Sequence, residues 1–287
     1  DPSREARGDE SRLHPRARSP DFESISPSLR VEGRVLSRLT EVLVFYVRLV
    51  STLIWVVFAS LVAFPLALVR WRNADNNYLF GVFYGRVARA IMGIRVHVEG
   101  GEYLKIRPAT FVINHQSGLD LATLSRVYPR GAVIIGKKEL RRIPAFGLMF
   151  EAFGNVLIDR KDRRNALSGL NTAVAEMKRK NLSAWIFPEG TRHPTGEGLL
   201  PFKKGAFYMA IQSGTPIVPI VCSRLARLVN FDRRYARSGD LVVRVLPPIE
   251  TKGLGRDEVE GLLETTRTRM VATLVEVNAK AEGMGRA

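Results

Sequence analysis

The sequence is poor in the side chains that form disulfides or bind transition metals. It holds one cysteine in 287 residues, so no disulfide can form within it, and a reducing compartment is expected. Its four histidines are His14, His97, His115 and His193, and no two are close in sequence. Zinc sites use closely spaced histidine and cysteine ligands. We therefore expect no metal and no cofactor, and a metal-dependent hydrolase is disfavoured.

Acidic side chains are scarce relative to basic ones. The 28 Asp and Glu residues face 44 Lys and Arg residues, which gives a formal net charge of +16. Such a charge attracts lipid headgroups, phosphorylated substrates or nucleic acid. No zinc-finger or RNP-like motif is visible, and a nucleic-acid-binding module does not require a long apolar run. We therefore expect membrane lipids, and no nucleic acid, among the partners.

One long uncharged run, Leu49 to Val69, indicates a membrane anchor. A helix of its 21 residues rises roughly 31 Å, about the thickness of a hydrocarbon core. Basic residues lie on both sides of the run, whereas a single crossing usually has them on one side. We therefore predict a bent or re-entrant helical anchor with both ends facing the cytoplasm; a buried core helix is the alternative. A cleaved signal peptide is disfavoured, because Ala67 to Arg70 is a poor cleavage site.

Composition and periodicity divide the chain into three parts. Residues 1–40 are polar and basic, so we expect a disordered tail. Residues 41–94 form the membrane-anchoring helical segment, which ends in an amphipathic helix from Tyr78 to Ile94 that packs on the sheet or contacts lipid. Residues 95–287 alternate strands with helices, which predicts an α/β catalytic domain with a mainly parallel sheet flanked by helices.

The expected strands and helices of that domain follow from apolar runs and helical spacing. The strands are Arg95–Val98, Ala109–Ile113, Ala132–Ile135, Asn155–Ile158, Ser183–Phe187, Ile217–Cys222 and Leu241–Leu246. The helices are Leu121–Val127, Ala145–Phe153, Arg164–Lys180, Lys204–Ser213 and Asp257–Ala279. Cys222 falls in an apolar strand with no histidine near it in sequence, which indicates core packing.

A histidine and an aspartate follow the strand Ala109–Ile113. This strand delivers His115 to the carboxyl edge of the sheet, and Ser117 with Asp120 resembles a capping box whose acidic side chain reaches back toward His115. A carboxylate on one imidazole nitrogen fixes the tautomer and supports proton uptake at the other. The pair is suited to activating an alcohol. The alternative is a polar loop histidine beside an ordinary helix cap.

A second polar motif follows the strand Ser183–Phe187. Pro188 and Gly190 force a turn there, which offers backbone N–H groups and the guanidinium of Arg192 to an anion. A planar guanidinium suits bidentate binding of a phosphate. The alternative is a surface turn with a solvated arginine.

These motifs together resemble the PlsC-like glycerolipid acyltransferases, and specifically the 1-acylglycerol-3-phosphate acyltransferases. His115 and Asp120 match the H-x4-D motif of that family, and Phe187 to Arg192 match F-P-E-G-T-R without a substitution. Further blocks are similar and stand in family order between about residues 95 and 225. They are Gly136–Leu140 with Pro144 and Gly147, Ile158–Arg160, Phe202–Phe207 and Thr215–Ile220.

The resemblance implies an O-acyltransferase of phospholipid biosynthesis. A fatty acyl group would pass from acyl-CoA or acyl carrier protein to the sn-2 hydroxyl of 1-acylglycerol 3-phosphate (lysophosphatidic acid), giving phosphatidic acid. It assigns His115 as general base and Asp120 as its orienting partner. Lys137 and the turn at Gly190 would stabilise the oxyanion, Thr191 and Arg192 would bind the acceptor with Arg192 on its phosphate, and Glu189 would contact the glycerol.

Several alternatives remain open at this point. Related enzymes acylate glycerol 3-phosphate, other lysophospholipids or lyso-ornithine lipids, and short blocks do not separate these acceptors. A basic membrane-tethered binding protein without catalysis is the distant alternative. We expect a location on the cytoplasmic face of a membrane, the inner membrane if the cell is bacterial.

Overall fold

The structure is a computed structural model that describes residues 27–142, 146–158, 163–193, 195 and 197–285. Pro144, Asp159 and Arg160 of the sequence blocks lie outside these residues. The chain divides into two units, residues 1–40 and residues 41–287. Residues 27–40 of the first unit are helical, although the sequence predicted disorder up to residue 40. Pro27 suits the start of a helix because no N–H donor is needed there.

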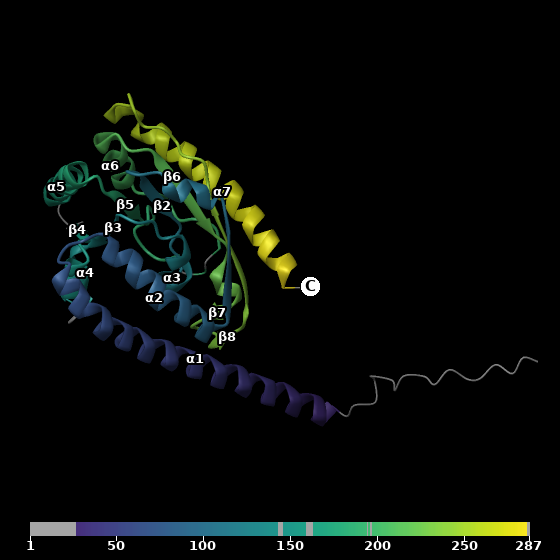
Figure 1. The fold of residues 1–287 in the computed structure, drawn as a ribbon. Coiled ribbons are helices and arrows are strands. Elements are labelled where there is room, and N and C mark those ends of the chain that lie inside the picture. The colour runs from purple at the N-terminus through teal and green to yellow at the C-terminus, as the bar shows by residue number, and fades with distance from the viewer. Residues whose placement is uncertain (1–26, 143–145, 159–162, 194, 196, 286–287) are drawn as a thin grey trace, which may run out of the picture. The chain divides into compact units, whose positions relative to one another are not determined.

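A seven-stranded sheet forms the centre of the second unit, with the order β1-β9-β6-β2-β5-β3-β4 (Figure 1). Neighbouring strands are parallel except β6 and β9, which are antiparallel. The predicted mainly parallel sheet is therefore confirmed. The strands are β1 (Ile94–Glu99), β2 (Thr110–Ile113), β3 (Ala132–Lys137), β4 (Val156–Ile158), β5 (Ser183–Ile186), β6 (Ile217–Cys222) and β9 (Gly239–Val245).

Helices cover both faces of this sheet, as the fully buried β2 requires. Its Phe111 joins the core on the α2 side with Met92, whereas Val112 joins the core on the α7 side with Met270. Figure 1 shows α2 and α7 on opposite sides of the sheet. The helices after α1 are α2 (Asp75–Met92), α3 (Asp120–Thr123), α4 (Phe146–Ala152), α5 (Arg163–Lys180), α6 (Gly205–Ser213) and α7 (Val259–Met284).

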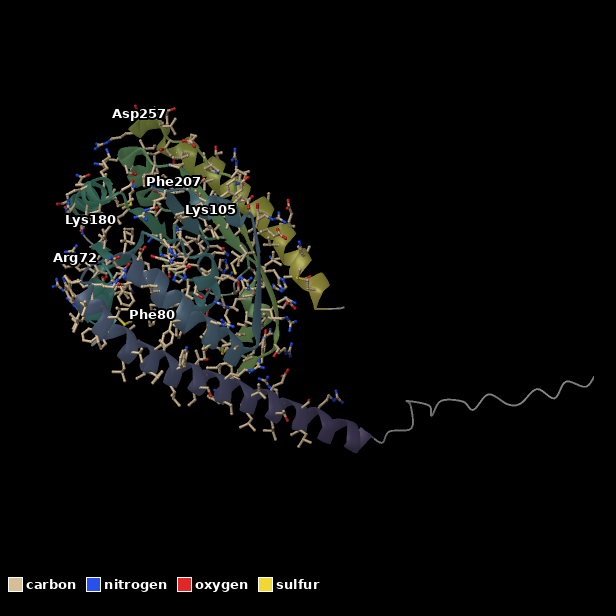
Figure 2. The ribbon with its side chains drawn as sticks, viewed as in Figure 1. Arg72, Phe80, Lys105, Lys180, Phe207 and Asp257 are labelled. Atoms are coloured by element: carbon tan, nitrogen blue, oxygen red, sulfur yellow. The ribbon has the colours of Figure 1, made fainter. Side chains whose placement is uncertain are left out.

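Helix α1 (Pro27–Val69) is continuous, and Pro65 lies inside it. From Glu41 onward one side of α1 packs on the domain: Phe45 and Ala59 are buried, and Trp55 Nε1 donates a hydrogen bond to the carbonyl of Tyr84 at 2.9 Å. The other side carries exposed apolar side chains, which Figure 2 shows as carbon sticks along the helix. They include Leu43, Val47, Val50, Leu53, Ile54, Val57, Leu61, Val62 and Leu66.

Among the described residues, α1 is the one helix long and apolar enough to cross a membrane, judged by length and composition. The apolar run is one uninterrupted helix. The chain instead turns at residues 70–74 and returns as α2, so the two helices form a hairpin. An extensively exposed apolar face is unfavourable in water, so α1 indicates membrane anchoring.

Helix α2 carries apolar side chains on two faces, one buried and one exposed. Phe80, Tyr84 and Ala88 are buried, and Phe80 stacks on Tyr84 with ring centroids 5.4 Å apart. The stripe that the sequence suggested for sheet or lipid contact includes Val82 and Phe83, and both are exposed. The exposed stripe of α2 therefore adds to the exposed apolar surface of α1, while the alternate face packs on the domain.

A short hairpin was missing from the sequence-based prediction. It pairs β7 (Val229–Asn230) with β8 (Tyr235–Ala236) in antiparallel register. Each strand has only two residues and the tip between them is charged, so no alternating pattern marks it in the sequence.

Candidate active site

His115 and Asp120 form a hydrogen-bonded pair beyond the carboxyl end of β2. His115 Nδ1 lies 2.7 Å from Asp120 Oδ2, and the imidazole is 21% exposed whereas the carboxylate is buried. With Nδ1 engaged as donor to the carboxylate, the lone pair of the ring lies on Nε2. The arrangement therefore leaves Nε2 able to accept a proton from a substrate hydroxyl.

The carboxylate of Asp120 is held by more than the imidazole. Its Oδ2 also accepts the backbone N–H groups of Gln116 at 2.9 Å and Ser117 at 3.2 Å. The acidic side chain thus reaches back as predicted, but the cap differs in detail. Helix α3 begins at Asp120 itself, and the hydroxyl of Ser117 accepts the N–H of Leu119. These bonds fix the carboxylate and so fix the ring that it holds.

The F-P-E-G-T-R turn lies directly against His115. Phe187 follows β5 and stacks on the imidazole with ring centroids 4.1 Å apart and an interplanar angle of 22°. The N–H of His193 donates to the carbonyl of His115 at 2.9 Å. Because β2 and β5 are parallel neighbours, both motifs emerge at the same edge of the sheet. The fold therefore joins the two motifs that the sequence identified separately.

Glu189 is buried, with 2% of its surface exposed, and both carboxylate oxygens accept backbone N–H groups. Oε1 accepts the N–H of His115 at 2.8 Å, and Oε2 accepts that of Leu200 at 2.9 Å. Burial raises the pKa of the Glu189 carboxyl, and the two backbone hydrogen bonds oppose that rise. The observed contacts of Glu189 are therefore with the main chain around the histidine.

Gly190 occupies the tightest point of the turn. Its φ is +70°, in the left-handed region that favours glycine, and its N–H donates to the carbonyl of Phe187 at 3.0 Å. A Cβ at this position would lie 2.9 Å from Lys203 Nζ. The turn therefore favours glycine for its backbone, and the end of the Lys203 side chain approaches it closely.

Arg192 and Lys137 lie at the same edge of the sheet. Arg192 is exposed, and a Cβ built on Gly118 would be 3.8 Å from its Nη1, so the guanidinium borders the loop that carries His115. Lys137 is the last residue of β3, which is parallel to β5, and its side chain is exposed. Thr191 is exposed as well. The guanidinium of Arg192 therefore borders the histidine loop, and Lys137 is a second cation at the same edge of the sheet.

Two polar residues that flank His115 were not selected from the sequence. The buried amide of Asn114 donates to the carbonyl of Cys222 at 3.0 Å and accepts the N–H of Cys222 at 2.8 Å. Gln116 Nε2 donates to the carbonyls of Cys222 and Ser223, both at 3.0 Å. The two amides therefore fasten the histidine loop to the end of β6. Their one sequence signal is a polar residue on each side of a histidine directly after an apolar strand.

Cys222 itself is buried, as expected for core packing. Burial raises the pKa of its thiol, and the nearby charge of Asp120 raises it further. A thiol of this kind is a poor nucleophile at neutral pH.

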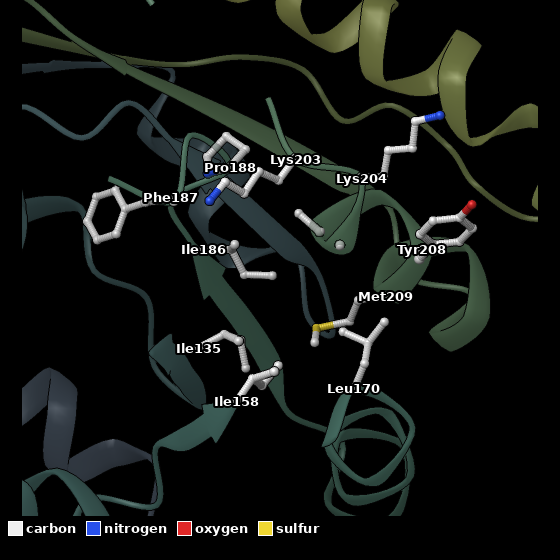
Figure 3. Close-up of a pocket in the computed structure, with 13 residues that line it drawn as sticks. Ile135, Ile158, Leu170, Ile186, Phe187, Pro188, Lys203, Lys204, Tyr208 and Met209 are labelled. Carbon is white, nitrogen blue, oxygen red and sulfur yellow. The ribbon is translucent and has the colours of Figure 1, made fainter. Parts of the chain in front are cut away.

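An apolar cavity of about 300 Å³ opens beneath the F-P-E-G-T-R turn (Figure 3). Phe187 and Gly190 border it at the turn, and Figure 3 shows Lys203 beside Pro188 at the same border. Its interior is lined by Ile135, Ile158, Leu170, Ile186 and Met209. An apolar cavity with a cation at its border suits an alkyl chain with a polar or anionic end.

Comparison with known proteins agrees with this geometry. A family model described as "Acyltransferase" matches residues 95–223. The 1-acyl-sn-glycerol-3-phosphate acyltransferase alpha of Mus musculus is 36% identical over 80% of this chain and 81% of its own length. The 1-acyl-sn-glycerol-3-phosphate acyltransferase of Escherichia coli (strain K12) is 34% identical over 85% of this chain and 100% of its own length.

A solved structure is also similar. The crystal structure of the 1-acyl-sn-glycerophosphate (LPA) acyltransferase PlsC from Thermotoga maritima has a TM-score of 0.61 and 25% identity. The match covers 84% of this chain and 98% of that chain. Both motifs identified in the sequence lie within the region matched by the family model. The chain therefore belongs to the PlsC-like 1-acyl-sn-glycerol-3-phosphate acyltransferase family.

Proposed function

We propose that this chain transfers a fatty acyl group from a thioester to the sn-2 hydroxyl of 1-acylglycerol 3-phosphate and so makes phosphatidic acid. The observation that carries the mechanism is the 2.7 Å contact between His115 Nδ1 and Asp120 Oδ2. His115 Nε2 takes the hydroxyl proton as the alcohol oxygen attacks the thioester carbonyl. The C–S bond then breaks, and the proton passes from His115 to the departing thiolate. Asp120 stabilises the imidazolium in between.

The acceptor phosphate is assigned to Arg192, with Thr191 beside it. The exposed guanidinium of Arg192 supports this assignment, because it lies next to Gly118, which belongs to the loop that follows His115. Lys137 is assigned to the oxyanion formed on the thioester carbonyl. Within the turn, the N–H of Gly190 already donates to Phe187, so a second oxyanion donor would come from the backbone after Gly190.

Glu189 is assigned a positioning role in place of the expected glycerol contact. Its two carboxylate oxygens each accept a backbone N–H, and one of these belongs to His115. A carboxylate held in this way fixes the main chain that carries the base. The glycerol portion of the acceptor is left to the exposed residues of the turn.

The donor is acyl-CoA or acyl carrier protein, both of which are anionic and fit the excess of basic residues. Membrane lipid is the second partner, and nucleic acid is not among the partners. The chain is placed on the cytoplasmic face of its membrane, the inner membrane if the cell is bacterial. The unpaired cysteine and the exposed apolar face of α1 support this placement.

The test is an assay of the purified full chain with acyl-CoA and, in parallel, with acyl carrier protein as donor. Lysophosphatidic acid, glycerol 3-phosphate, a lysophosphatidylcholine and a lyso-ornithine lipid serve as acceptors. The proposal predicts that kcat/KM is highest for lysophosphatidic acid. A higher value for another acceptor would reassign the substrate within the family, and no product with any acceptor would favour a binding protein without catalysis.

A further inference from the structure

The β7–β8 hairpin ends in an exposed tip of four residues, Phe231 to Arg234. The phenyl ring of Phe231 is 47% exposed, and Asp232, Arg233 and Arg234 are exposed beside it. The tip has a defined shape: the N–H of Arg233 donates to Asn230 Oδ1 at 2.7 Å. A large apolar ring is thus presented to the outside on a structured turn.

This hairpin is fastened to α1. The Phe231 ring packs edge to face on Phe45, with centroids 5.7 Å apart and an interplanar angle of 83°. Arg237, just after β8, donates to Glu41 Oε1 from Nε at 3.0 Å and from Nη2 at 2.7 Å. Arg48 Nη1 donates to the carbonyl of Ala236 at 3.0 Å. Three contacts within two turns of α1 therefore set the position of the hairpin along the helix.

The contact residues of α1 alternate with its exposed apolar residues. Phe45 and Arg48 face the hairpin. Val47, which lies between them in sequence, and Val50, which follows them, are exposed. The hairpin therefore packs on the side of α1 that faces the domain, and its exposed tip lies beside the helix that carries the apolar face assigned to the membrane. In a bilayer that takes up α1 as far as the level of Phe45, the half-exposed ring of Phe231 would lie at the level of the headgroups. Aromatic rings and arginines are the side chains best suited to the boundary between headgroups and hydrocarbon.

We propose that the tip of the β7–β8 hairpin, Phe231 to Arg234, is a second membrane-contact element. Phe231 enters the boundary between headgroups and acyl chains, and Arg233 and Arg234 contact lipid phosphates. The inference rests on the proposed anchoring through α1. With contacts through α1 and the exposed stripe of α2, the domain could still tilt about the axis of α1, and a further contact beside α1 would limit that tilt.

The hairpin also connects the membrane to the catalytic loop. Gln116, next to His115, accepts the N–H of Leu225 through Oε1 at 2.9 Å, and Leu225 lies just before β7. Tyr235 of β8 donates its hydroxyl hydrogen to the carbonyl of Ala226 at 2.7 Å. Contact of the tip with lipid therefore sets the height of the imidazole above the surface from which a lipid acceptor arrives.

Nitroxide labels at three introduced cysteines test the proposal in the full chain. Phe231→Cys reports the tip, Val57→Cys on α1 is the positive control, and Val275→Cys on α7, across the sheet, is the matched exposed control. Cys222 is the one native cysteine and is buried, and the unsubstituted protein measures any background from it. The vesicles contain phosphatidylcholine with or without phosphatidylglycerol. At each site we compare how strongly the nitroxide spin is relaxed by oxygen, which enters the bilayer, and by a water-soluble nickel chelate, which does not.

The expected result is that the label at 231 behaves like that at 57, more accessible to oxygen than to nickel, while the label at 275 shows the reverse. Anionic lipid should give the label at 231 extra protection from nickel, and the double variant Arg233→Gln, Arg234→Gln should lose that extra protection. The expected loss is about fivefold in the equilibrium constant for docking of the tip, for each arginine removed. A tip label as accessible to nickel as that at 275, with 57 inside the bilayer, would overturn the inference and leave the anchor intact. If the label at 57 were also accessible to nickel, the proposed membrane anchoring through α1 would be rejected. Spin–spin broadening at 231 that vanishes on dilution into lipid would assign the tip to a second copy of the chain instead.

Discussion

Oε1 of Glu189 lies 2.8 Å from the backbone nitrogen of His115, so the F-P-E-G-T-R motif holds the proposed general base by its main chain. The stacked ring of Phe187 and the N–H of His193 act on the same residue. The position of the imidazole is therefore set from three sides by one turn. A substitution at Glu189 should therefore affect catalysis, although its carboxylate is assigned no contact with the substrate.

Glu189→Gln should lower kcat and leave the KM for lysophosphatidic acid within about twofold of wild type. A glutamine has one acceptor oxygen, so one of the N–H groups of His115 and Leu200 would face its NH2 group. We expect kcat to fall about 10- to 100-fold, the size of effect that a small misplacement of a catalytic group produces. Steady-state kinetics with varied acceptor measure both constants.

Asp75→Asn is the matched control for Glu189→Gln, because Asp75 Oδ1 accepts the N–H of Gly131 at 2.7 Å in a loop that holds no proposed site residue. It should lower the Tm by a comparable amount and keep kcat near wild type. A rise in KM for Glu189→Gln at unchanged kcat would instead restore the glycerol contact as its role.

Arg192→Ala should raise the KM for lysophosphatidic acid and lower kcat/KM about 10- to 100-fold. A hydrogen bond to a charged group contributes roughly 1.5–3 kcal/mol, which corresponds to that factor. Arg192→Lys should recover part of the loss, since it keeps the charge but not the planar fork. Wild type, Arg192→Ala and Arg192→Lys should have the same kcat/KM for monoacylglycerol, which lacks the phosphate. A loss of the same size on monoacylglycerol would mean that Arg192 does not act on the phosphate.

Gly190→Ala should lower both stability and activity, and Gly214→Ala separates the two effects. Both glycines have φ of +70°, but a Cβ on Gly190 would meet Lys203 Nζ at 2.9 Å, whereas a Cβ on Gly214 meets nothing within 4 Å. Each substitution should cost about 1–2 kcal/mol of unfolding free energy through the backbone. Only Gly190→Ala should also reduce kcat/KM. Equal activity of the two variants would show that the approach of Lys203 to the turn does not matter.

Asp240→Asn should destabilise the protein at neutral pH and much less in acid. The hydrogen bonds from Arg95, followed by that from His97, hold the pKa of Asp240 at about 2. The usual pKa of an unfolded aspartate is about 3.9. Because the pKa is lower in the folded state, the ionised carboxylate stabilises the fold above about pH 4, and this stabilisation is lost as the pH falls toward 2.

Thermal unfolding of the wild type and Asp240→Asn across that pH range measures the effect. The difference in Tm should be largest at neutral pH and should shrink between about pH 4 and pH 2. A difference that stays constant over this range would contradict the depressed pKa.

The sequence predicted best what is local. His115 and Asp120 are five residues apart, and a strand followed by a helix start is enough to bring them together. The strand Ile217–Cys222 was predicted with its observed bounds because its apolar run is bounded by turn residues. Such features depend on a few neighbouring residues.

What depends on strand order could not be predicted. Glu189 and His115 are 74 residues apart, and their contact follows from β5 lying beside β2. Asn114 and Gln116 act on the end of β6 for the same reason. The reversal of β9 and the two-residue strands β7 and β8 leave no periodic pattern, so they appear only in the folded chain. Sequence spacing gives the members of the site but not the hydrogen bonds that hold them.

The role of His115 as general base is tested by the rate at which His115→Ala forms phosphatidic acid from acyl-CoA and lysophosphatidic acid, compared with wild type. General-base catalysis contributes typically 10²- to 10⁴-fold, so we expect kcat to fall at least about 10²-fold in a protein that still unfolds cooperatively near the wild-type Tm. A folded His115→Ala protein that retains a kcat within about tenfold of wild type would contradict that role.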